Sequence, residues 1–275
     1  MPSRKFQDQT VLVTGGSSGL GLAIAEAFAQ AGACVCLVAR NEDRLELAAD
    51  ELKRQGHTRI TTFSADVTCN EQVDNLFHSL ERQSPELNVL VNAVGVSDRA
   101  AILDVSPERF QRLWELNFLA VVRCTRAAAP MLVRSRGRIV NIGSLASKVA
   151  PPYLGAYPAT KFALAAYSQQ LRLELQPRGV RVLLVCPGPV ERKDAGSRYD
   201  ALAADLPPSA RQPGGGANLK AIDASDLAQR IVSACDRGKS ELVIPPKVKW
   251  LAAVAQIVPS WADRVLLKRT GSDAK

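Results

Sequence analysis

The sequence predicts an α/β fold: a single doubly wound parallel β-sheet of about seven strands with helices on both faces. Three observations carry this prediction. Short apolar segments alternate with longer segments whose apolar residues recur at helical spacing, and the connections are mostly short. The strand-like segments are apolar almost throughout, which is typical of strands buried on both faces. The length of 275 residues and the 47% apolar content suit one large α/β domain.

Strand and helix segments follow one another in regular order. The predicted strands cover residues 10–13, 34–39, 60–63, 89–91, 138–142, 180–186 and 242–244. The predicted helices cover residues 19–31, 42–55, 70–83, 106–132, 156–176 and 224–237. The stretch 188–222 is rich in Pro, Gly and Asp, and an irregular segment of that length is typical of a lid. We therefore expect a main domain, residues 1–245, and a C-terminal extension, residues 246–275.

Charge limits the classes of partner. The formal net charge is +8, but the basic residues are scattered and only 5% of residues are aromatic, so nucleic acid is not an expected partner. An anionic cofactor, an acidic ligand or a membrane surface explains the charge better.

Cysteine and histidine usage predicts no metal site. The six cysteines include no Cys-x2-Cys pair, and the two histidines lie on unrelated segments, so reduced thiols in a cytoplasmic protein are expected. Residues 1–9 lack the apolar core of a signal peptide, and no segment reaches about 18 uninterrupted apolar residues.

A glycine-rich turn joins the first predicted strand to the first predicted helix. Its spacing, Gly-x3-Gly-x-Gly, lets the backbone approach a pyrophosphate, and the helix N-terminus directs N–H groups at such an anion. A tight turn without a ligand is the alternative, because a glycine turn alone is weak evidence. The candidate contact residues are Thr14, Gly15, Ser17, Ser18, Gly19, Leu20 and Gly21.

Three side chains further along the chain suit proton transfer. Tyr157 and Lys161 are four residues apart and share a helix face, and Ser144 follows the strand at 138–142. We expect the neighbouring ammonium, together with the positive charge of an oxidised nicotinamide, to lower the pKa of Tyr157. The phenol can then exchange a proton with a carbonyl oxygen that Ser144 also hydrogen-bonds. A Tyr-x3-Lys pair alone is common on helix surfaces. The interpretation depends on the joint occurrence of the glycine turn, Asn92, Asn117 and these three residues.

Together these motifs resemble those of the classical short-chain dehydrogenase/reductase family, over residues 8–245. The resemblance implies a Rossmann fold and oxidoreductase chemistry with a nicotinamide cofactor. It implies catalytic roles for Ser144, Tyr157, Lys161 and Asn117, with Lys161 also holding the nicotinamide ribose and Asn117 binding a water of a proton relay. The other cofactor contacts that it implies, besides Tyr157 and Lys161, are Asp66, Val67, Asn92, Ala93, Gly95, Pro187, Gly188 and Val190.

The chain departs from the family pattern at two places. Ala93-Val94 stands where the family has Asn-Ala, which is expected to remove polar contacts that support the site, although Asn92 and Gly95 remain. Pro158 lacks an N–H and disfavours helical backbone at the residue before it, so we expect the helix to begin here with Pro158 in its first turn.

The end of the second predicted strand indicates the nicotinamide cofactor. An acidic residue there would bind ribose hydroxyls and favour NAD(H). Arg40 instead offers a planar fork for a 2′-phosphate, with Asn41 and Arg44 close by, although a solvent-exposed arginine is the alternative. The sequence therefore favours NADP(H) over NAD(H) and the reductive direction.

The substrate is less well defined. Residues 145–154 are mostly apolar and suit an apolar carbonyl compound, but ordinary loop packing explains them equally well. Four basic residues of the 188–222 stretch suit an acidic substrate instead: Arg192, Lys193, Arg198 and Arg211. We expect an NADP(H)-dependent enzyme that interconverts a carbonyl and a secondary alcohol on an apolar or lipid-like small molecule. The alternatives are a 3-oxoacyl-thioester reductase and a cofactor-binding sensor or scaffold without turnover.

The C-terminal extension combines Trp250 and Trp261 with apolar residues and basic flanks. Such a segment can lie in a membrane interface, so peripheral membrane contact through residues 247–269 is one expectation. A dimer contact or a core-packing helix explains it as well. The family resemblance implies a homodimer or homotetramer formed through the helices at 106–132 and 156–176.

Overall fold

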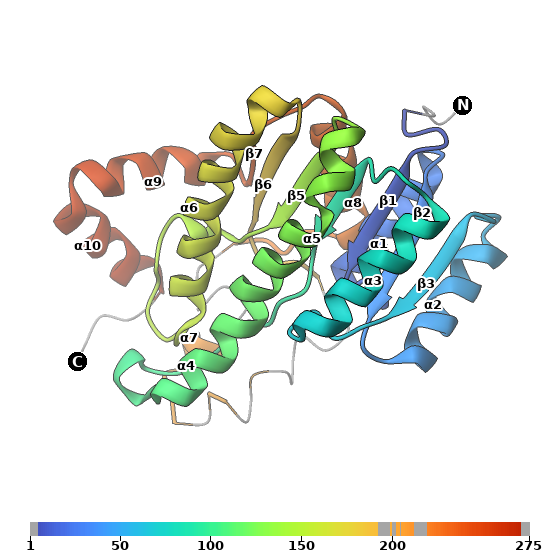
Figure 1. Cartoon of the computed structure of the whole chain (residues 1–275). Helices are drawn as coiled ribbons and strands as arrows, with labels where there is room; N and C mark the ends of the chain where they lie inside the picture. The colour runs from blue at the N-terminus through green and yellow to red at the C-terminus, as the bar shows by residue number, and fades with distance from the viewer. Residues whose placement is uncertain (1–4, 192–198, 200–201, 204, 212–218, 271–275) are drawn as a thin grey trace.

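The computed structural model describes residues 5–191, 199, 202–203, 205–211 and 219–270. Its centre is a seven-stranded parallel sheet in the order β3-β2-β1-β4-β5-β6-β7, which confirms the predicted architecture (Figure 1). Each strand lies within one or two residues of its predicted position. The strands are β1 (Thr10–Thr14), β2 (Cys34–Ala39), β3 (Ile60–Ser64), β4 (Val89–Asn92), β5 (Arg138–Ile142), β6 (Arg181–Pro187) and β7 (Glu241–Ile244).

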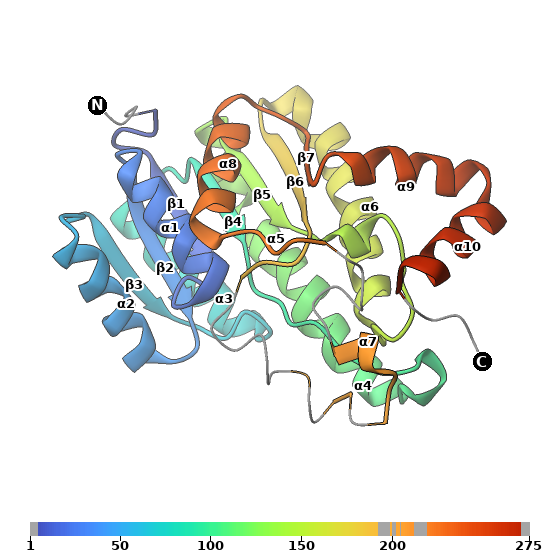
Figure 2. The ribbon, with the colours of Figure 1, turned by 180° about the vertical axis from the view of Figure 1, so that it is seen from behind.

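Helices cover both faces of the sheet, as Figures 1 and 2 show from opposite sides. One face packs against α1 (Gly19–Gln30), α2 (Glu42–Arg54) and α8 (Ala224–Asp236). The other packs against α3 (Asn70–Gln83), α5 (Ala120–Arg134) and α6 (Tyr157–Leu175). Successive side chains of a strand point to opposite faces of the sheet, so both faces are apolar and can be covered by helices. In β1, Val11 and Val13 face the first group of helices and Leu12 faces the second.

The strand order reverses beside β1, whose two neighbours are β2 and β4. In α/β sheets a ligand binds in the crevice outside the strand ends at such a switch point. The register places Thr14 opposite Asn92, and Asn92 opposite Asn141, at the carboxyl ends of β1, β4 and β5. The sheet therefore brings three polar residues into one row at the predicted binding edge.

The long helix predicted at 106–132 is present but is not regular throughout. It consists of α4 (Pro107–Trp114), a π-helical turn (Glu115–Leu119) and α5. Ser106 caps α4, because its side chain accepts a hydrogen bond from the Arg109 N–H at 3.3 Å, and Pro107 occupies the first turn. Single π-helical turns are frequent at functional sites, and this one contains Asn117.

The same run, Pro107–Arg134, is the one helix among the described residues with the length and composition needed to cross a membrane. Of its most apolar window, 44% is buried inside the protein. Leu132, Met131 and Ala128 of α5 belong to the core against the sheet, so packing within the domain explains its apolar character.

The remaining helical segments lie at the substrate side and the C-terminus. Short 3-10 turns cover Ile102–Asp104, Leu145–Ser147 and Gln176–Arg178. The stretch 188–222 contains a short helix, α7 (Pro208–Arg211), while 192–198 and 212–218 lie outside the described residues. The C-terminal extension forms two helices, α9 (Lys247–Ile257) and α10 (Pro259–Thr270), which project from the β7 side of the molecule (Figure 2).

Candidate active site

The row of polar residues at the strand ends is tied together by buried hydrogen bonds. The Asn92 side-chain amide donates to Asn141 Oδ1 at 2.9 Å, and the Asn141 amide donates to Ser168 Oγ on α6 at 2.9 Å. Thr14 Oγ1 donates to the Val91 carbonyl at 3.3 Å and accepts from the Ala93 N–H at 3.1 Å. These bonds fix the crevice between β1, β4 and β5, because an unpaired buried polar group is costly.

The glycine turn leaves room for a phosphate at the start of α1. Gly15 and Gly19 have φ values of +70° and +54°, which suit glycine. A Cβ on Gly21 would overlap the Gly15 carbonyl, so the helix can approach the turn this closely only with glycine there. Ser18 is the N-cap but makes no side-chain cap bond, and Gly19 has no atom within 4 Å of its Cβ position. The turn fits a dinucleotide pyrophosphate, with helix N–H groups directed at the anion.

At the adjacent strand end, Arg40 extends into solvent with a 69% exposed side chain. Its Nη1 lies 3.7 Å from Asp66 Oδ2. Burial acts to raise the pKa of Asp66, but hydrogen bonds from Thr68 and the charge of Arg40 outweigh it and lower that pKa below its usual value. The Asn41 side chain caps α2 by accepting the Arg44 N–H at 2.8 Å. Arg40 is therefore available to an anionic ligand, while the side-chain oxygen of Asn41 is already bonded.

Ser144 and Tyr157 meet at the carboxyl end of β5. Ser144 caps a 3-10 turn: its Oγ accepts the Ala146 N–H at 3.1 Å, and its own N–H donates to Ser147 Oγ at 3.2 Å. This reciprocal capping holds the Ser144 hydroxyl in place, and that hydroxyl is hydrogen-bonded to Tyr157. Tyr157 is the first residue of α6 and Pro158 the second, as the sequence predicted.

Lys161 lies one helical turn after Tyr157 and is 4% exposed. Its Nζ donates to the Ile142 carbonyl at 2.9 Å and lies 5.7 Å from the centre of the Tyr157 ring. Burial lowers the pKa of Lys161 to about 8. The ammonium is therefore held beside the tyrosine by the end of β5.

The protein groups alone do not produce the expected fall in the pKa of Tyr157. Burial raises this pKa to about 12, and the hydrogen bond with Ser144 and the charge of Arg99 only partly oppose the increase. The physical reason is that the free-energy penalty for removing a phenolate from water exceeds the stabilisation that these contacts provide.

Asn117 is fully buried in the π-helical turn. Its Oδ1 accepts the Val96 N–H at 2.8 Å, and its Nδ2 donates to the Val96 carbonyl at 2.9 Å and to Thr160 Oγ1 at 3.2 Å. A Cβ on Gly95 would lie 3.1 Å from Asn117 Oδ1 and 3.5 Å from Lys161 Nζ. Asn117 therefore joins the segment after β4 to α6 and lies beside the lysine.

The departures from the family pattern have modest consequences. Through its main-chain N–H, Ala93 keeps a hydrogen bond to Thr14 Oγ1, and Val94 packs against the core near the glycine turn.

The remaining predicted cofactor contacts lie at the far side of the crevice or are largely covered. The Gly188 N–H, after Pro187, donates to the Ile244 carbonyl at 2.8 Å, and Val190 pairs with Ile222. Val67 is 4% exposed, so little of its surface is free for a ligand.

The substrate side consists of several segments. Leu145, Ala146 and Leu154 are buried, and the described part of the 188–222 stretch reaches the segment after β4 through a 2.6 Å hydrogen bond between Tyr199 Oη and Ser97 Oγ. Arg192, Lys193 and Arg198 lie outside the described residues, whereas Arg211 ends α7. In the part of the chain that the structure covers, no group of three His, Cys, Asp or Glu residues could hold a metal ion.

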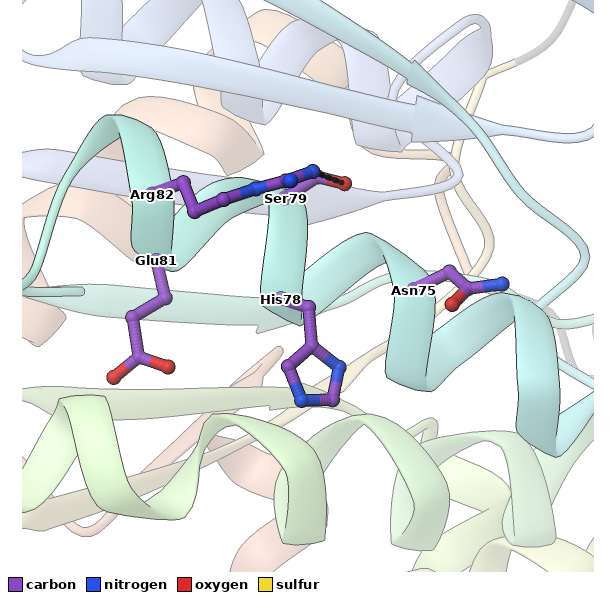
Figure 3. Close-up of a pocket in the computed structure, with 5 residues that line it drawn as sticks. All are labelled: Asn75, His78, Ser79, Glu81 and Arg82. Carbon is purple, nitrogen blue, oxygen red and sulfur yellow. Dashed lines mark hydrogen bonds between the residues drawn. The ribbon is translucent and has the colours of Figure 1, made fainter.

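A separate depression of about 590 Å³ runs along the outer face of α3 (Figure 3). It is lined by Asn75, His78, Ser79, Glu81 and Arg82, and the Arg82 guanidinium donates to Ser79 Oγ at 3.4 Å. None of the catalytic candidates lines it, so it is a different surface from the crevice at the strand ends.

Sequence reasoning missed several residues that build the site. Asn141 and Thr160 are fully buried and hold Asn92 and Asn117. An asparagine inside an otherwise apolar strand was a usable signal for the first, and the Ser-x2-Ser spacing was one for the Ser144–Ser147 cap. Buried Arg99 on the substrate side had no local signal.

Comparison with known proteins agrees with this geometry. The family model for short chain dehydrogenases matches residues 9–201. A short chain dehydrogenase of Pseudocercospora fijiensis is 33% identical over 202 residues, which is 72% of this chain but only 64% of the fungal protein. The ketoacyl reductase HetN of a Nostoc species is 30% identical over 264 residues, covering 94% of this chain and 88% of HetN.

A solved structure shares the architecture. L-sorbose reductase from Gluconobacter frateurii, complexed with NADPH and L-sorbose, superposes with a TM-score of 0.77 at 28% identity, covering 88% of this chain and 96% of the reductase. The sheet order, the glycine turn and the Ser144–Tyr157–Lys161 cluster fit this family. The chain therefore belongs to the short-chain dehydrogenase family of oxidoreductases with a Rossmann fold.

Proposed function

We propose that the protein is an NADP(H)-dependent enzyme that interconverts a carbonyl compound and a secondary alcohol. The observation that carries the proposal is the meeting of Ser144, Tyr157 and Lys161 at the carboxyl end of β5, across the sheet edge from the glycine turn. A bound nicotinamide supplies or accepts the hydride at the carbonyl carbon. The protein's own contribution is to bind, orient and protonate.

Each catalytic side chain has a separate task in the proposed mechanism. Tyr157 Oη donates a proton to the carbonyl oxygen during reduction, and Ser144 Oγ hydrogen-bonds that oxygen and stabilises its developing charge. Lys161 Nζ favours the phenolate and binds the nicotinamide ribose. Asn117 binds a relay water through its main-chain carbonyl, since both ends of its side chain are bonded to Val96.

The preference for NADP(H) rests on Arg40. Its exposed guanidinium at the end of β2 suits a 2′-phosphate, and its proximity to Asp66 orients it. The structural relative L-sorbose reductase was crystallised with NADPH. We expect the other cofactor contacts to follow the strand ends, from the Thr14–Gly21 turn through Asn92 to Gly188.

The proposed substrate is an apolar or lipid-like ketone, which the mostly apolar segment 145–154 between Ser144 and Tyr157 suits. A 3-oxoacyl thioester is the second candidate, because the relative HetN is named a ketoacyl reductase. A cofactor-binding sensor without turnover is the candidate outside enzymes. The presence of Ser144, Tyr157 and Lys161 in one cluster argues against it.

The test is NADPH oxidation across a panel of small polar ketones, acetoacetyl thioesters and steroid-like ketones. We expect turnover that Tyr157→Phe lowers by about two to four orders of magnitude while NADPH still binds. Preference for the thioesters over free ketones would select the second candidate. NADPH binding without turnover of any compound would favour the sensor.

We also propose peripheral membrane contact through the α9–α10 hairpin of a cytoplasmic homodimer or homotetramer. Trp250, Val254 and Ile257 follow one face of α9, and Trp250 and Ile257 are each 79% exposed. The same two helices carry exposed Lys247, Lys249, Arg264 and Lys268, and a basic, tryptophan-bearing surface suits anionic lipid headgroups.

Sedimentation with anionic and with zwitterionic vesicles tests the membrane proposal. We expect binding to anionic vesicles that Trp250→Ser with Ile257→Ser abolishes. Leu47→Ser is the matched control, because Leu47 on α2 is 69% exposed but lies away from the hairpin. If the double variant binds vesicles normally but light scattering gives it a different oligomeric mass from the unaltered protein, the surface is an interface with a second subunit instead.

A further inference from the structure

A buried arginine lies on the substrate side of the site without a role in the mechanism so far. Arg99 is 2% exposed and follows β4 by seven residues. A buried guanidinium is costly unless its surroundings compensate its charge. The contacts around Arg99 show what holds it.

Two elements hold the Arg99 side chain. Its Nε donates to the Ala210 carbonyl of α7 at 2.7 Å, and its Nη1 donates to the Asp98 carbonyl at 2.6 Å. The Tyr199 ring covers the guanidinium face, with Cζ 3.8 Å from the ring centre. Donors directed at main-chain carbonyls and a face covered by an aromatic ring do not suit the bidentate binding of a substrate carboxylate. Burial lowers the pKa of Arg99, and the charges of Tyr199, Tyr157 and Asp98 oppose that decrease.

The main chain places Ala100, the residue after Arg99, against the segment that precedes the catalytic tyrosine. Ala100 forms a bridge with Leu154, and the Gly155 N–H donates to the Ala100 carbonyl at 3.1 Å. The Tyr157 N–H in turn donates to the Leu154 carbonyl at 3.1 Å. On the other side, the Asp98 carboxylate pairs with Arg109, whose Nη2 also donates to the Arg99 carbonyl at 2.9 Å. The segment Ser97–Ala100, here called the strap, is thus fixed against the start of α6.

We propose that Arg99 is a positioning residue for proton transfer, whose buried guanidinium acts on the Tyr157 hydroxyl from the substrate side and favours the phenolate. The inference rests on the proposed function. The groups that face Tyr157 are Ser144 after β5, Cys186 on β6, Lys161 on α6 itself, Tyr199 of the 188–222 stretch and Arg99 of the strap.

The charges of these groups explain why a second cation is useful. Burial raises the pKa of Tyr157, the hydrogen bond with Ser144 and the charge of Arg99 lower it, and Tyr199 and Cys186 raise it. Burial also lowers the pKa of Lys161 to about 8, so the lysine loses charge in the alkaline range. Burial lowers the pKa of Arg99 as well, but from a much higher ordinary value, so the guanidinium stays protonated where the lysine loses its proton. Tyr199 and Ala210, which hold Arg99, belong to the stretch expected to cover the substrate, so the covering segment and the proton donor are linked.

The test is the pH dependence of kcat/KM for alcohol oxidation, in which Tyr157 must lose its proton. Neutralising Arg99 with Arg99→Gln is expected to move the alkaline rise in activity upward by about one pH unit, and to lower the rate about tenfold below that rise. Arg99→Lys keeps the charge and is expected to restore most of the profile. The dissociation constant for NADPH should stay unchanged in both variants.

Arg138→Gln is the matched control, because Arg138 also lies over an aromatic ring, that of Phe6 at 5.5 Å, but at the amino end of β5. An unchanged pH profile in folded Arg99→Gln, with only KM raised, would overturn the inference and leave the proposed function intact. Should the neutral variant fail to fold, a shift of one pH unit in Arg99→Lys would overturn it equally. Absence of turnover in the unaltered protein would overturn the proposed function and this inference together.

Discussion

The cofactor half and the substrate half of the site are built in different ways. On the cofactor half, the turn at Thr14–Gly21 and the end of β2 each lie within one βα unit, so short stretches of sequence determine their shape. On the substrate half, the strap, the Leu145–Leu154 loop and Tyr199 of the 188–222 stretch come from distant parts of the chain. The first half can be inferred from spacing, and the second depends on long-range contacts that spacing does not encode.

The largest effect is expected from a methyl group at the glycine turn. Gly21→Ala places a Cβ against the Gly15 carbonyl, so the turn must open. We expect loss of about 1–3 kcal/mol of stability and NADPH binding at least about tenfold weaker, measured by thermal melting and fluorescence titration. Gly56→Ala is the control, because Gly56 has a φ of +94° but no atom within 4 Å. Unchanged NADPH binding in Gly21→Ala would contradict the assignment of the turn.

Reversing the charge at position 40 tests how the cofactor half distinguishes NADPH from NADH. Arg40→Asp removes the proposed 2′-phosphate contact and should weaken NADPH binding at least about tenfold, or about 1.4 kcal/mol, while NADH binding is spared. Arg54→Asp reverses an exposed charge at the far end of α2 and controls for net charge. If the two affinities move together in Arg40→Asp, the proposed role of Arg40 is wrong.

Lys161 lies between the two halves. Its burial in the charged form lowers the free energy of unfolding, and this effect should depend on pH. Its pKa is about 8 in the folded protein against an ordinary lysine value of 10.5, so the unfolded chain binds more protons between these values and stability rises with pH across that window. Lys161→Met should lack this rise. Without cofactor, we expect it to be about 1 kcal/mol more stable than the unaltered protein at pH 7, with the advantage gone near pH 10.5. Melting curves at both pH values decide this, and a pH-independent difference would argue against it.

A methyl group on the substrate half should have the smallest effect. Gly155 has a φ of +50°, and a Cβ there would overlap the Asp98 carboxylate of the strap. We expect Gly155→Ala to raise KM for the carbonyl substrate by about three- to fivefold, which corresponds to less than about 1 kcal/mol. NADPH binding should remain normal, in contrast to Gly21→Ala. A weaker NADPH complex would show that the two halves are not independent.

The same contrast explains how much the sequence could predict. Short apolar segments between helical patterns predicted the seven strands, and Pro158 correctly marked the start of α6, because these signals are local. The π-helical turn around Asn117 interrupts the long helix, and the apolar periodicity of that segment does not indicate the interruption. The pKa of Tyr157 was expected to fall, and its burial, which no residue spacing reports, reverses the direction.

Arg99 illustrates the limit most clearly. In the sequence it is one of 35 basic residues, and nothing within the strap distinguishes it from a solvated side chain. Its burial depends on Tyr199 and Ala210, which lie about a hundred residues further along the chain. Local periodicity carries no information over that separation.

The α9–α10 hairpin also affects how the protein is observed by spectroscopy. Two of the three tryptophans, Trp250 and Trp261, lie on it with 79% and 43% exposure, and the third, Trp114, packs against Phe118 at a ring separation of 4.9 Å. Exposed indoles dominate the response to a quencher dissolved in water. Intrinsic fluorescence will therefore report mainly on the surroundings of this hairpin, and a probe placed elsewhere is needed to follow the unfolding of the sheet.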